Sequence, residues 1–445
     1  MDGASLSLLW AVPFAGMLLS IALVPLVAPH FWHGHYGKVA LGWALSLLLP
    51  LVAVFGASLA SHELVHALLA EYAPFILLLV ALFTVSGGIH IRGNLRCNPL
   101  TNTAILAIGG LLASVMGTTG ASMLLIRPLI RANDNRVHKV HTIVFFIFIV
   151  SNIGGSLTPL GDPPLFLGFL KGVDFFWTAR NILPDTLLVT AALLAIFYAL
   201  DRHWYRKEGL LPYDPTPDTK RIGVDGGANL FLLAGVIGLV LMSGLWKSGV
   251  VFDVYGTPLG LPGLVRDVGL VAITSISLKL TTAQVHAANQ FEWEPMREVA
   301  KLFAGIFVTI APVIAMLKAG VDGPFSAVVT AVTHPGGEPN PAMYFWATGL
   351  LSAFLDNAPT YLVFFNTAGG DAEVLMTARA STLAAISAGA VFMGALSYIG
   401  NAPNLMVKAI AQSRGVRMPG FFGYMAWSCT ILLPLFVVCT LLFLR

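Results

Sequence analysis

Apolar segments of roughly 20 residues or more, separated by short polar loops, recur along the whole chain. A helix needs about 20 consecutive apolar residues to cross the hydrocarbon core of a bilayer. The pattern therefore predicts an all-α polytopic membrane protein. Its predicted spans are 6–28, 38–59, 73–91, 140–170, 181–201, 227–246, 264–282, 299–318, 374–412 and 421–444.

Two of these segments, 140–170 and 374–412, are too long for one straight span and are interrupted by Gly, Pro and Asn. The first contains Ser-Asn-Ile-Gly-Gly at 151–155 and Gly-Asp-Pro-Pro at 161–164, and the second contains Gly-Asn-Ala-Pro-Asn at 400–404. Lipid cannot satisfy freed backbone N–H and C=O groups, so such breaks occur only inside protein or beside a wet cavity. We expect two broken helices.

Two further apolar stretches, 103–131 and 341–370, are each broken in the middle, and each is flanked by loops of a single charge character. Arg92 and Arg127 belong to a basic set around the first, whereas Asp322 and Asp371 belong to an acidic set around the second. A re-entrant hairpin, which leaves by the face it entered, gives this pattern. The positive-inside rule then assigns the first hairpin to the cytoplasmic face and the second to the outer face.

The order of these features predicts two inverted repeats of about five spans each. Residues 1–205 form the first repeat, with hairpin 103–131 and broken helix 140–170. Residues 227–445 form the second, with hairpin 341–370 and broken helix 374–412. A Pro- and Asp-rich loop, 206–226, is expected to join them on the cytoplasmic side. Paired interruptions in two halves indicate a transporter whose binding site lies where the repeats meet.

The composition agrees with a protein that has no sizeable soluble domain. The chain has 445 residues, of which 57% are hydrophobic and only 11% charged, whereas soluble domains carry about 25% charged residues. The net charge of +3 gives no reason to expect a nucleic-acid partner. The expected partner is the lipid bilayer, and the expected location is a bacterial inner (cytoplasmic) membrane.

Ionisable residues within membrane segments are costly and are functional candidates by default. Asp162 follows the break in the first broken helix, and Asp356 lies at the break of the second hairpin. Burial favours the neutral form of a carboxylate, whereas a nearby cation favours the charged form, so one carboxylate can hold either a proton or a sodium ion. Alternatively, these carboxylates only cap helix termini or pair with a buried base such as Arg127.

Uncharged oxygen donors lie beside the same breaks and are candidates to complete an oxygen cage around a hard cation. Their alternative role is to satisfy the broken backbone. These candidates are Thr118, Thr119, Asn152, Thr158, Asn357, Thr360, Asn401 and Asn404.

A different class of protein is suggested by His62-Glu63-Leu64-Val65-His66, which matches the H-E-x-x-H pattern of zinc proteases. Asp356 is the only candidate nominated for a third ligand. The pattern is expected in a short loop between spans, whereas an intramembrane protease needs it on a buried helix, so the zinc protease is a remote alternative.

At segments 86–90, 151–164, 354–360 and 400–404 the sequence resembles the NhaD-type sodium/proton antiporters. That family belongs to an ion-transporter superfamily that also holds arsenite permeases, citrate transporters and divalent-anion/sodium symporters. The resemblance implies ion sites at hairpin tips and broken helices, and often a homodimer. Two departures stand out. Segment 117–119 reads Gly-Thr-Thr where relatives often carry Asp-Asn, and the Ser-Asn-Thr tips of the dicarboxylate symporters are absent.

The function expected first is therefore a secondary active transporter that exchanges sodium or lithium for protons, with Asp356 and Asp162 as the sodium ligands. No organic cofactor is implied, because sodium ions and protons are the coupling or transported species. The alternative is an anion carrier for citrate, another carboxylate or arsenite, in which hairpin N-termini and Arg127 face the anion.

Overall fold

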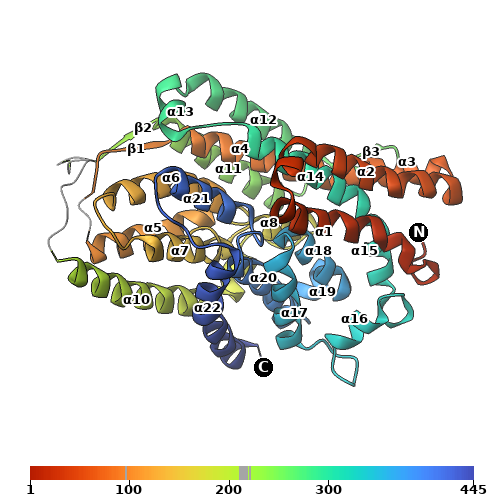
Figure 1. Ribbon diagram of the computed structural model, residues 1–445. Coiled ribbons are helices and arrows are strands. Elements are labelled where there is room, and N and C mark those ends of the chain that lie inside the picture. Colours follow the sequence, from red (N-terminus) through yellow and green to blue (C-terminus); the bar gives the residue numbers. More distant parts are fainter. Residues whose placement is uncertain (96–97, 210–218, 220–221, 445) are drawn as a thin grey trace.

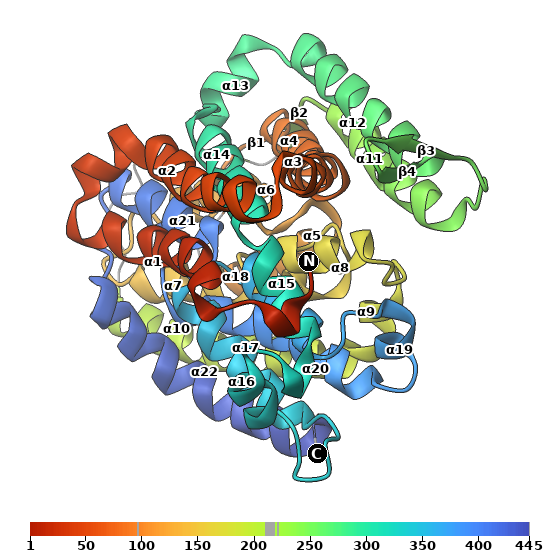
Figure 2. The same ribbon diagram turned by 90° about the vertical axis from the view of Figure 1, so that its right-hand side faces the viewer.

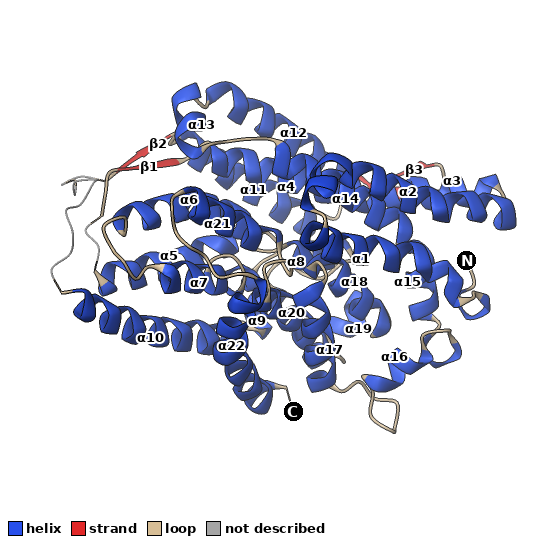
Figure 3. Ribbon diagram, viewed as in Figure 1, coloured by secondary structure: helices blue, strands red, loops and turns tan. Residues whose placement is uncertain are grey.

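The computed structural model describes residues 1–444 except 96–97, 210–218 and 220–221. Helices make up almost the whole of this part of the chain (Figure 3). Nine of its helical segments are long and apolar enough to cross a membrane, or ten if one bent pair counts as a span. The long helices are α1 (Val12–Val27), α2 (Pro29–Phe55), α4 (Ala73–Gly87), α10 (Leu183–Glu208), α11 (Ala228–Leu245), α12 (Leu261–Leu280), α14 (Glu294–Thr309) and α22 (Phe421–Phe443).

The bent pair consists of α14 and α15 (Ala311–Lys318), which meet at an angle of 44° where the sequence suggested one straight span, 299–318. Pro312 explains the bend, because proline cannot donate an intrahelical hydrogen bond. Short elements complete the helical set: α9 (Trp177–Asn181), α13 (Ala283–Asn289), α16 (Ser326–Ala331), α19 (Ala372–Met376) and the 3-10 turns Gly3–Ser5, Leu8–Ala11 and Gly320–Asp322.

Both predicted hairpin segments contain a helix break. In the first, α5 (Pro99–Met116) and α6 (Thr118–Ala132) are separated by Gly117, whose φ of 82° is readily adopted only by glycine. In the second, α17 (Pro341–Phe354) and α18 (Asn357–Thr367) are separated by two residues. Asn98 and Asn340 cap the entering helices in the same way, each just before a proline.

Both predicted broken helices are interrupted by non-helical backbone. The first consists of α7 (Val140–Ile149), a 3-10 turn (Ile153–Leu157) and α8 (Pro163–Leu170). The second consists of α20 (Ala380–Met393), a 3-10 turn (Gly394–Leu396) and α21 (Ala402–Ser413). It begins later than the sequence suggested, because α19 forms a separate turn of helix before it.

The contacts within these two hairpin and broken-helix units match at a constant spacing of 239 residues. The Thr158 hydroxyl donates to the Ser114 carbonyl, and the Ser397 hydroxyl donates to the Ala353 carbonyl. The amide two residues later then donates back to each hydroxyl, at 3.2 Å in the first unit and 3.1 Å in the second.

A pair of glycines approaches closely at the same spacing. A methyl group on Gly161 would lie 2.1 Å from the Gly155 carbonyl oxygen, and one on Gly400 would lie 2.6 Å from the Gly394 carbonyl oxygen. Both distances are far too short for a real contact, so these positions require glycine. The two units therefore share a backbone arrangement.

The units lie at the centre of the molecule. Every residue of α7 after Val140 is buried, and so is nearly every residue of α6. Helices such as α1, α2, α10, α12 and α22 lie toward the outside of the ribbon in Figures 1 and 2, and about three-quarters of the best membrane-crossing window of each faces outward. Broken backbone is thus enclosed by protein, as membrane depth requires.

The structure differs from the all-α prediction by two small strand pairs, and it differs from the predicted loop at His62 and His66 by a helix. Two small antiparallel pairs are present: β1 (His90–Arg92) with β2 (Gly223–Asp225), and β3 (Val251–Val254) with β4 (Thr257–Gly260). The H-E-x-x-H pattern lies on helix α3 (Ala57–His66), which continues through a π-helical turn (Ala67–Tyr72) into α4. Most of the predicted junction loop, 206–226, lies outside the described residues, although β2 belongs to it.

Candidate functional site

Four helices begin at one cavity. Its lining includes the first residues of α6, α8, α18 and α21, together with the residues that precede them. Apolar walls come from α4, through Leu78, Leu79, Leu82 and Phe83, and from α14, through Met296, Val299 and Phe303. Both hairpins and both broken helices thus contribute their breaks to the same space. Helix N-termini carry partial positive charge, so the cavity favours negative groups.

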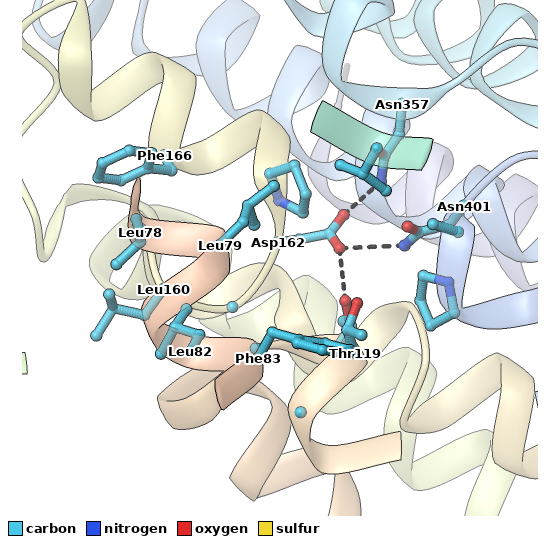
Figure 4. A pocket seen from close by; sticks show the side chains of 18 of the residues that line it. Leu78, Leu79, Leu82, Phe83, Thr119, Leu160, Asp162, Phe166, Asn357 and Asn401 are labelled. Atoms are coloured by element: carbon cyan, nitrogen blue, oxygen red, sulfur yellow. Dashed lines mark hydrogen bonds between the residues drawn. The ribbon is translucent and has the colours of Figure 1, made fainter. Parts of the chain in front are cut away.

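Asp162 is the centre of the polar part of this cavity. Its side chain is only 2% exposed and precedes α8. One carboxylate oxygen accepts hydrogen bonds from the Thr118 hydroxyl at 2.9 Å and from the Asn401 amide at 3.1 Å. The other oxygen accepts from the Asn357 amide at 2.5 Å. Figure 4 shows both amides directed at the carboxylate.

This arrangement joins the two units through one charge-bearing group. Thr118 belongs to the first hairpin, Asn357 to the second hairpin and Asn401 to the second broken helix. Three donors from three different elements fix the position of the carboxylate. Movement of either unit relative to the other would therefore change the number of donors that Asp162 receives.

Asp356 also lines the cavity, but its hydrogen bond is local. Its carboxylate accepts from the Ala358 amide at 3.1 Å and so caps α18. The neighbouring residue, Asn357, is the one that reaches Asp162. The side-chain carbonyl oxygen of Asn357 is buried and has no hydrogen-bond partner among the described residues. A buried acceptor without a partner is costly and suggests a missing donor or cation.

The structure separates the ten candidate residues into two groups. Thr118, Thr119, Asp162, Asp356, Asn357 and Asn401 line the cavity. The other four bond to the broken backbone: the Thr360 hydroxyl donates to the Asp356 carbonyl at 2.9 Å, Thr158 donates to the Ser114 carbonyl, and Asn152 and Asn404 pair with each other at 2.7 Å.

The pair Asn152 and Asn404 supports the site from behind. The Asn404 amide donates to the Gly394 and Ser397 carbonyls, both at 2.9 Å, and the Asn152 amide donates to the Ile147 carbonyl at 2.8 Å. Asn401 donates to the Asn152 side-chain oxygen at 3.3 Å. These amides thus satisfy freed carbonyls and hold Asn401 in position, which is the alternative role considered for them from the sequence.

The cavity differs from the prediction in two respects, its apolar walls and the place of Arg127. The apolar walls from α4 and α14 were not anticipated, because an apolar residue facing a cavity has no sequence signal that distinguishes it from one facing lipid. Arg127, expected to face a bound anion, is not among the cavity residues. It lies nine residues into α6 and donates to Gln290 at 3.2 Å.

The zinc alternative finds no support in the structure. A ring nitrogen of His62 lies 3.2 Å from the Tyr255 carbonyl oxygen on the β3–β4 turn. Within the described residues, no group of three or more His, Cys, Asp or Glu side chains is arranged to hold a metal ion. His62 and His66 therefore have no third ligand within the described part of the chain, although the pattern needs one.

Residues 3–444 match a family described as "Putative citrate transport". The chain belongs to this citrate transport family. Uncharacterized transporters of Mycobacterium bovis and Mycobacterium tuberculosis are each 24% identical to it over 331 residues, which cover 72% of this chain and 71% of theirs. A 46 kDa membrane protein of Mycobacterium leprae is 24% identical over 326 residues, with the same coverage.

Membership of the citrate transport family identifies a multi-pass integral membrane transporter, and not an enzyme. It agrees with the resemblance to the ion-transporter superfamily at the level of the superfamily. Within it, the match favours the alternative, a carrier of citrate or a similar carboxylate, over the sodium/proton antiporter that the sequence placed first.

Proposed function

We propose that this protein is a secondary transporter of a citrate-like carboxylate and that the anion binds in the cavity between the hairpins and broken helices. The observation that carries this proposal is the meeting of four helix N-termini at one cavity. The positive ends of the helix dipoles stabilise carboxylates there without a fixed cationic side chain. The hydroxyl of Thr119, which also lines the cavity, adds a further donor.

A carboxylate substrate must share this cavity with Asp162, so the proposal includes a coupling cation. Two negative groups repel strongly at short range in a medium of low dielectric. A proton or sodium ion on Asp162 removes this repulsion. The unpartnered side-chain oxygen of Asn357, next to the Asp162 carboxylate, supports a place for that cation.

The alternating-access part of the proposal retains the two inverted repeats, 1–205 and 227–445. The matching contacts at a spacing of 239 residues support an internal duplication. A site where two such repeats meet is reached from opposite faces when one unit moves relative to the other. The positive-inside rule supports the opposite orientation of the two units.

The test is uptake of radiolabelled citrate by proteoliposomes that contain the purified protein. We expect uptake that requires either a sodium gradient or an inward proton gradient, and that unlabelled tricarboxylates compete for. Protein-free liposomes and liposomes with the Asp162→Asn variant are the controls. Absence of uptake of citrate, succinate and malate under every gradient would contradict the proposal.

Sodium/proton exchange remains a second candidate, favoured by the presence of two carboxylates, Asp162 and Asp356, in one cavity. The same liposomes distinguish the two functions when they enclose a pH-sensitive dye and are made acidic inside. Sodium or lithium that raises the internal pH without any carboxylate favours exchange. Under that function Asp356→Asn abolishes the response, whereas carboxylate transport centred on Asp162 tolerates it.

A further inference from the structure

A buried guanidinium group lies outside the cavity and has no counter-charge among the described residues. Arg127 on α6 is 9% exposed, and its only hydrogen bond there goes from Nη2 to the Gln290 side-chain oxygen. Its Nε and Nη1 atoms are buried and unpartnered. A buried charge without a partner is strongly destabilising, so this geometry suggests that an anion belongs beside it.

The charged side chains nearest to Arg127 make the same point. Arg414 is close enough to act on Arg127 by Coulombic repulsion, and it acts on Arg131 as well. Arg131 donates to the Ile91 and Gly93 carbonyls, and its Nε atom is also buried without a partner. Asp134 also acts on Arg131, so three guanidinium groups face one carboxylate, and an anion beside Arg127 would offset the remaining repulsion.

The position of this cluster relates it to the cavity. Helix α6 begins at Thr118 in the cavity and reaches Arg127 nine residues later, a rise of about 13 Å along the helix. Helix α21 also begins at the cavity and ends beside Arg414. The two helices lie side by side (Figure 1). Both therefore lead from the cavity toward the face that carries Arg92, Arg131 and Arg136, which the positive-inside rule assigns to the cytoplasm.

An apolar cluster separates the cavity from Arg127. Phe83, Met123 and Met296 pack together, with Phe291 and Met406 against them. Phe83, Met296 and Met406 line the cavity, Met123 lies on α6 between Thr118 and Arg127, and Phe291 directly follows Gln290. Methionine side chains are flexible and repack easily, so this cluster is suited to open and close.

We propose that Arg127, Gln290 and Arg131 form a second anion site, which receives a carboxylate group of the substrate on the cytoplasmic side of the apolar cluster. The inference rests on the proposed carboxylate transport and assigns Arg127 to a step after the cavity. Gln290, which accepts the hydrogen bond from Arg127, is itself exposed, so this side of the proposed site borders the surface.

A lipid phosphate has the same chemistry but a poorer route to this site. Nearly every residue of α6 is buried within the protein, so the helix offers lipid no face on which a headgroup could settle. A substrate that leaves the cavity meets Arg127 along α6 itself. The structure therefore favours the transported carboxylate over a lipid as the occupant.

The first experiment measures anion binding without transport. The melting temperature of the purified full-length protein is followed as citrate is added at constant ionic strength. In Arg127→Gln we expect the citrate concentration for half-maximal stabilisation to rise about tenfold or more, the cost of losing a charged hydrogen-bond donor. Arg127→Lys should stay within a few-fold of wild type. Arg202→Gln, an exposed cation on α10, should match wild type.

Equal citrate dependence in Arg127→Gln and wild type would overturn the inference. So would the absence of any citrate-dependent stabilisation in the wild-type protein. A difference that appears only when phosphatidylglycerol replaces citrate would assign the site to a lipid headgroup and would also overturn it.

The second experiment uses sidedness. Citrate KM is measured in right-side-out vesicles and in everted vesicles. We expect Arg127→Gln to raise the KM about tenfold from the cytoplasmic face and to leave the outer-face KM within twofold. Equal changes on both faces would overturn the inference. Failure of the proposed function is separate, because it shows as absent citrate transport in the wild-type protein, whereas this inference can fail while the wild-type protein still transports citrate.

Discussion

The two hairpin and broken-helix units share their backbone contacts but differ in the side chains that they present to the cavity. Asp162 in the first unit corresponds to Asn401 in the second, and Thr118 corresponds to Asn357, both at the spacing of 239 residues. Three of these four side chains donate hydrogen bonds, and all three donate to Asp162. The two units therefore share backbone contacts, but only one of these four matched positions carries a carboxylate.

The hydrogen bonds to the broken backbone recur in both units, whereas the polar side chains that face the cavity differ. The Thr158 and Ser397 hydroxyls satisfy carbonyls that any such break leaves free, so both units need them. A second carboxylate at position 401 would lie within hydrogen-bond distance of Asp162. Two carboxylates at that distance repel strongly in a low-dielectric site, and asparagine at position 401 avoids this repulsion.

The largest effect is expected from removing the charge itself. Asp162→Asn should lower citrate uptake by about 100-fold or more. The amide keeps one acceptor oxygen but carries no charge, so three hydrogen bonds, each worth about 1.5–3 kcal/mol with a charged acceptor, are weakened or lost together with the binding place of the coupling cation. Initial uptake rates in proteoliposomes measure this. Normal uptake by a correctly inserted Asp162→Asn protein would show that the single charge is not part of transport.

Moving the charge to the other unit tests the correspondence directly. Asn401→Asp alone should reduce uptake about tenfold or more by like-charge repulsion next to Asp162. The double variant Asp162→Asn with Asn401→Asp restores one carboxylate at the matching position. We expect it to transport measurably faster than Asp162→Asn alone, with initial rates compared at equal protein content.

The opposite result is a double variant that is present in the membrane in equal amount and yet takes up citrate no faster than Asp162→Asn. That result would mean that the two units are alike in backbone only. The matched control is Asn404→Asp, which places a carboxylate in the second unit behind the cavity, where Asn404 bonds to backbone carbonyls. It should not restore uptake.

A smaller effect is expected at Asp356, whose carboxylate caps α18 through the Ala358 amide. Asparagine caps helices about as well as aspartate does, so Asp356→Asn should keep citrate uptake within about threefold of wild type. Asp356→Ala should cost about 1 kcal/mol of stability through loss of the cap. Loss of uptake in Asp356→Asn would instead indicate that this carboxylate holds the coupling cation.

The sequence predicted the breaks better than it predicted what the residues at the breaks contact. Gly117, Gly161 and Gly400 mark breaks because only glycine fits a positive φ or a close backbone approach, and that constraint is visible in the sequence. By contrast, the sequence put Asp356 first, whereas Asn357 is the residue that reaches Asp162. Which of two adjacent residues at a helix start points into a cavity depends on how the helix packs.

The apolar half of the cavity could not be read from the sequence for a related reason. Leu78 and Phe83 on α4, and Met296 on α14, lie on helices whose composition is that of any membrane span. Hydrophobicity alone does not distinguish a face that contacts lipid from one that lines a cavity. Arg127 shows the reverse case: its charge was an evident candidate, but its place along α6 puts it beyond the cavity residues.

The smallest effects on transport are expected from the recurring backbone contacts. Thr158→Val leaves one carbonyl and one amide without their hydroxyl partner, and Ser397→Ala leaves one carbonyl and two amides without theirs. Each should lower stability by about 1–3 kcal/mol, the cost of an unsatisfied buried polar group. Similar losses of melting temperature in the two variants, with citrate KM within about twofold of wild type, would support a shared structural role. If only Ser397→Ala destabilised the protein, the equivalence of the two units would be limited to their geometry. The comparison is sharp because both hydroxyls also lie outside the cavity, so neither substitution removes a group that would touch the substrate.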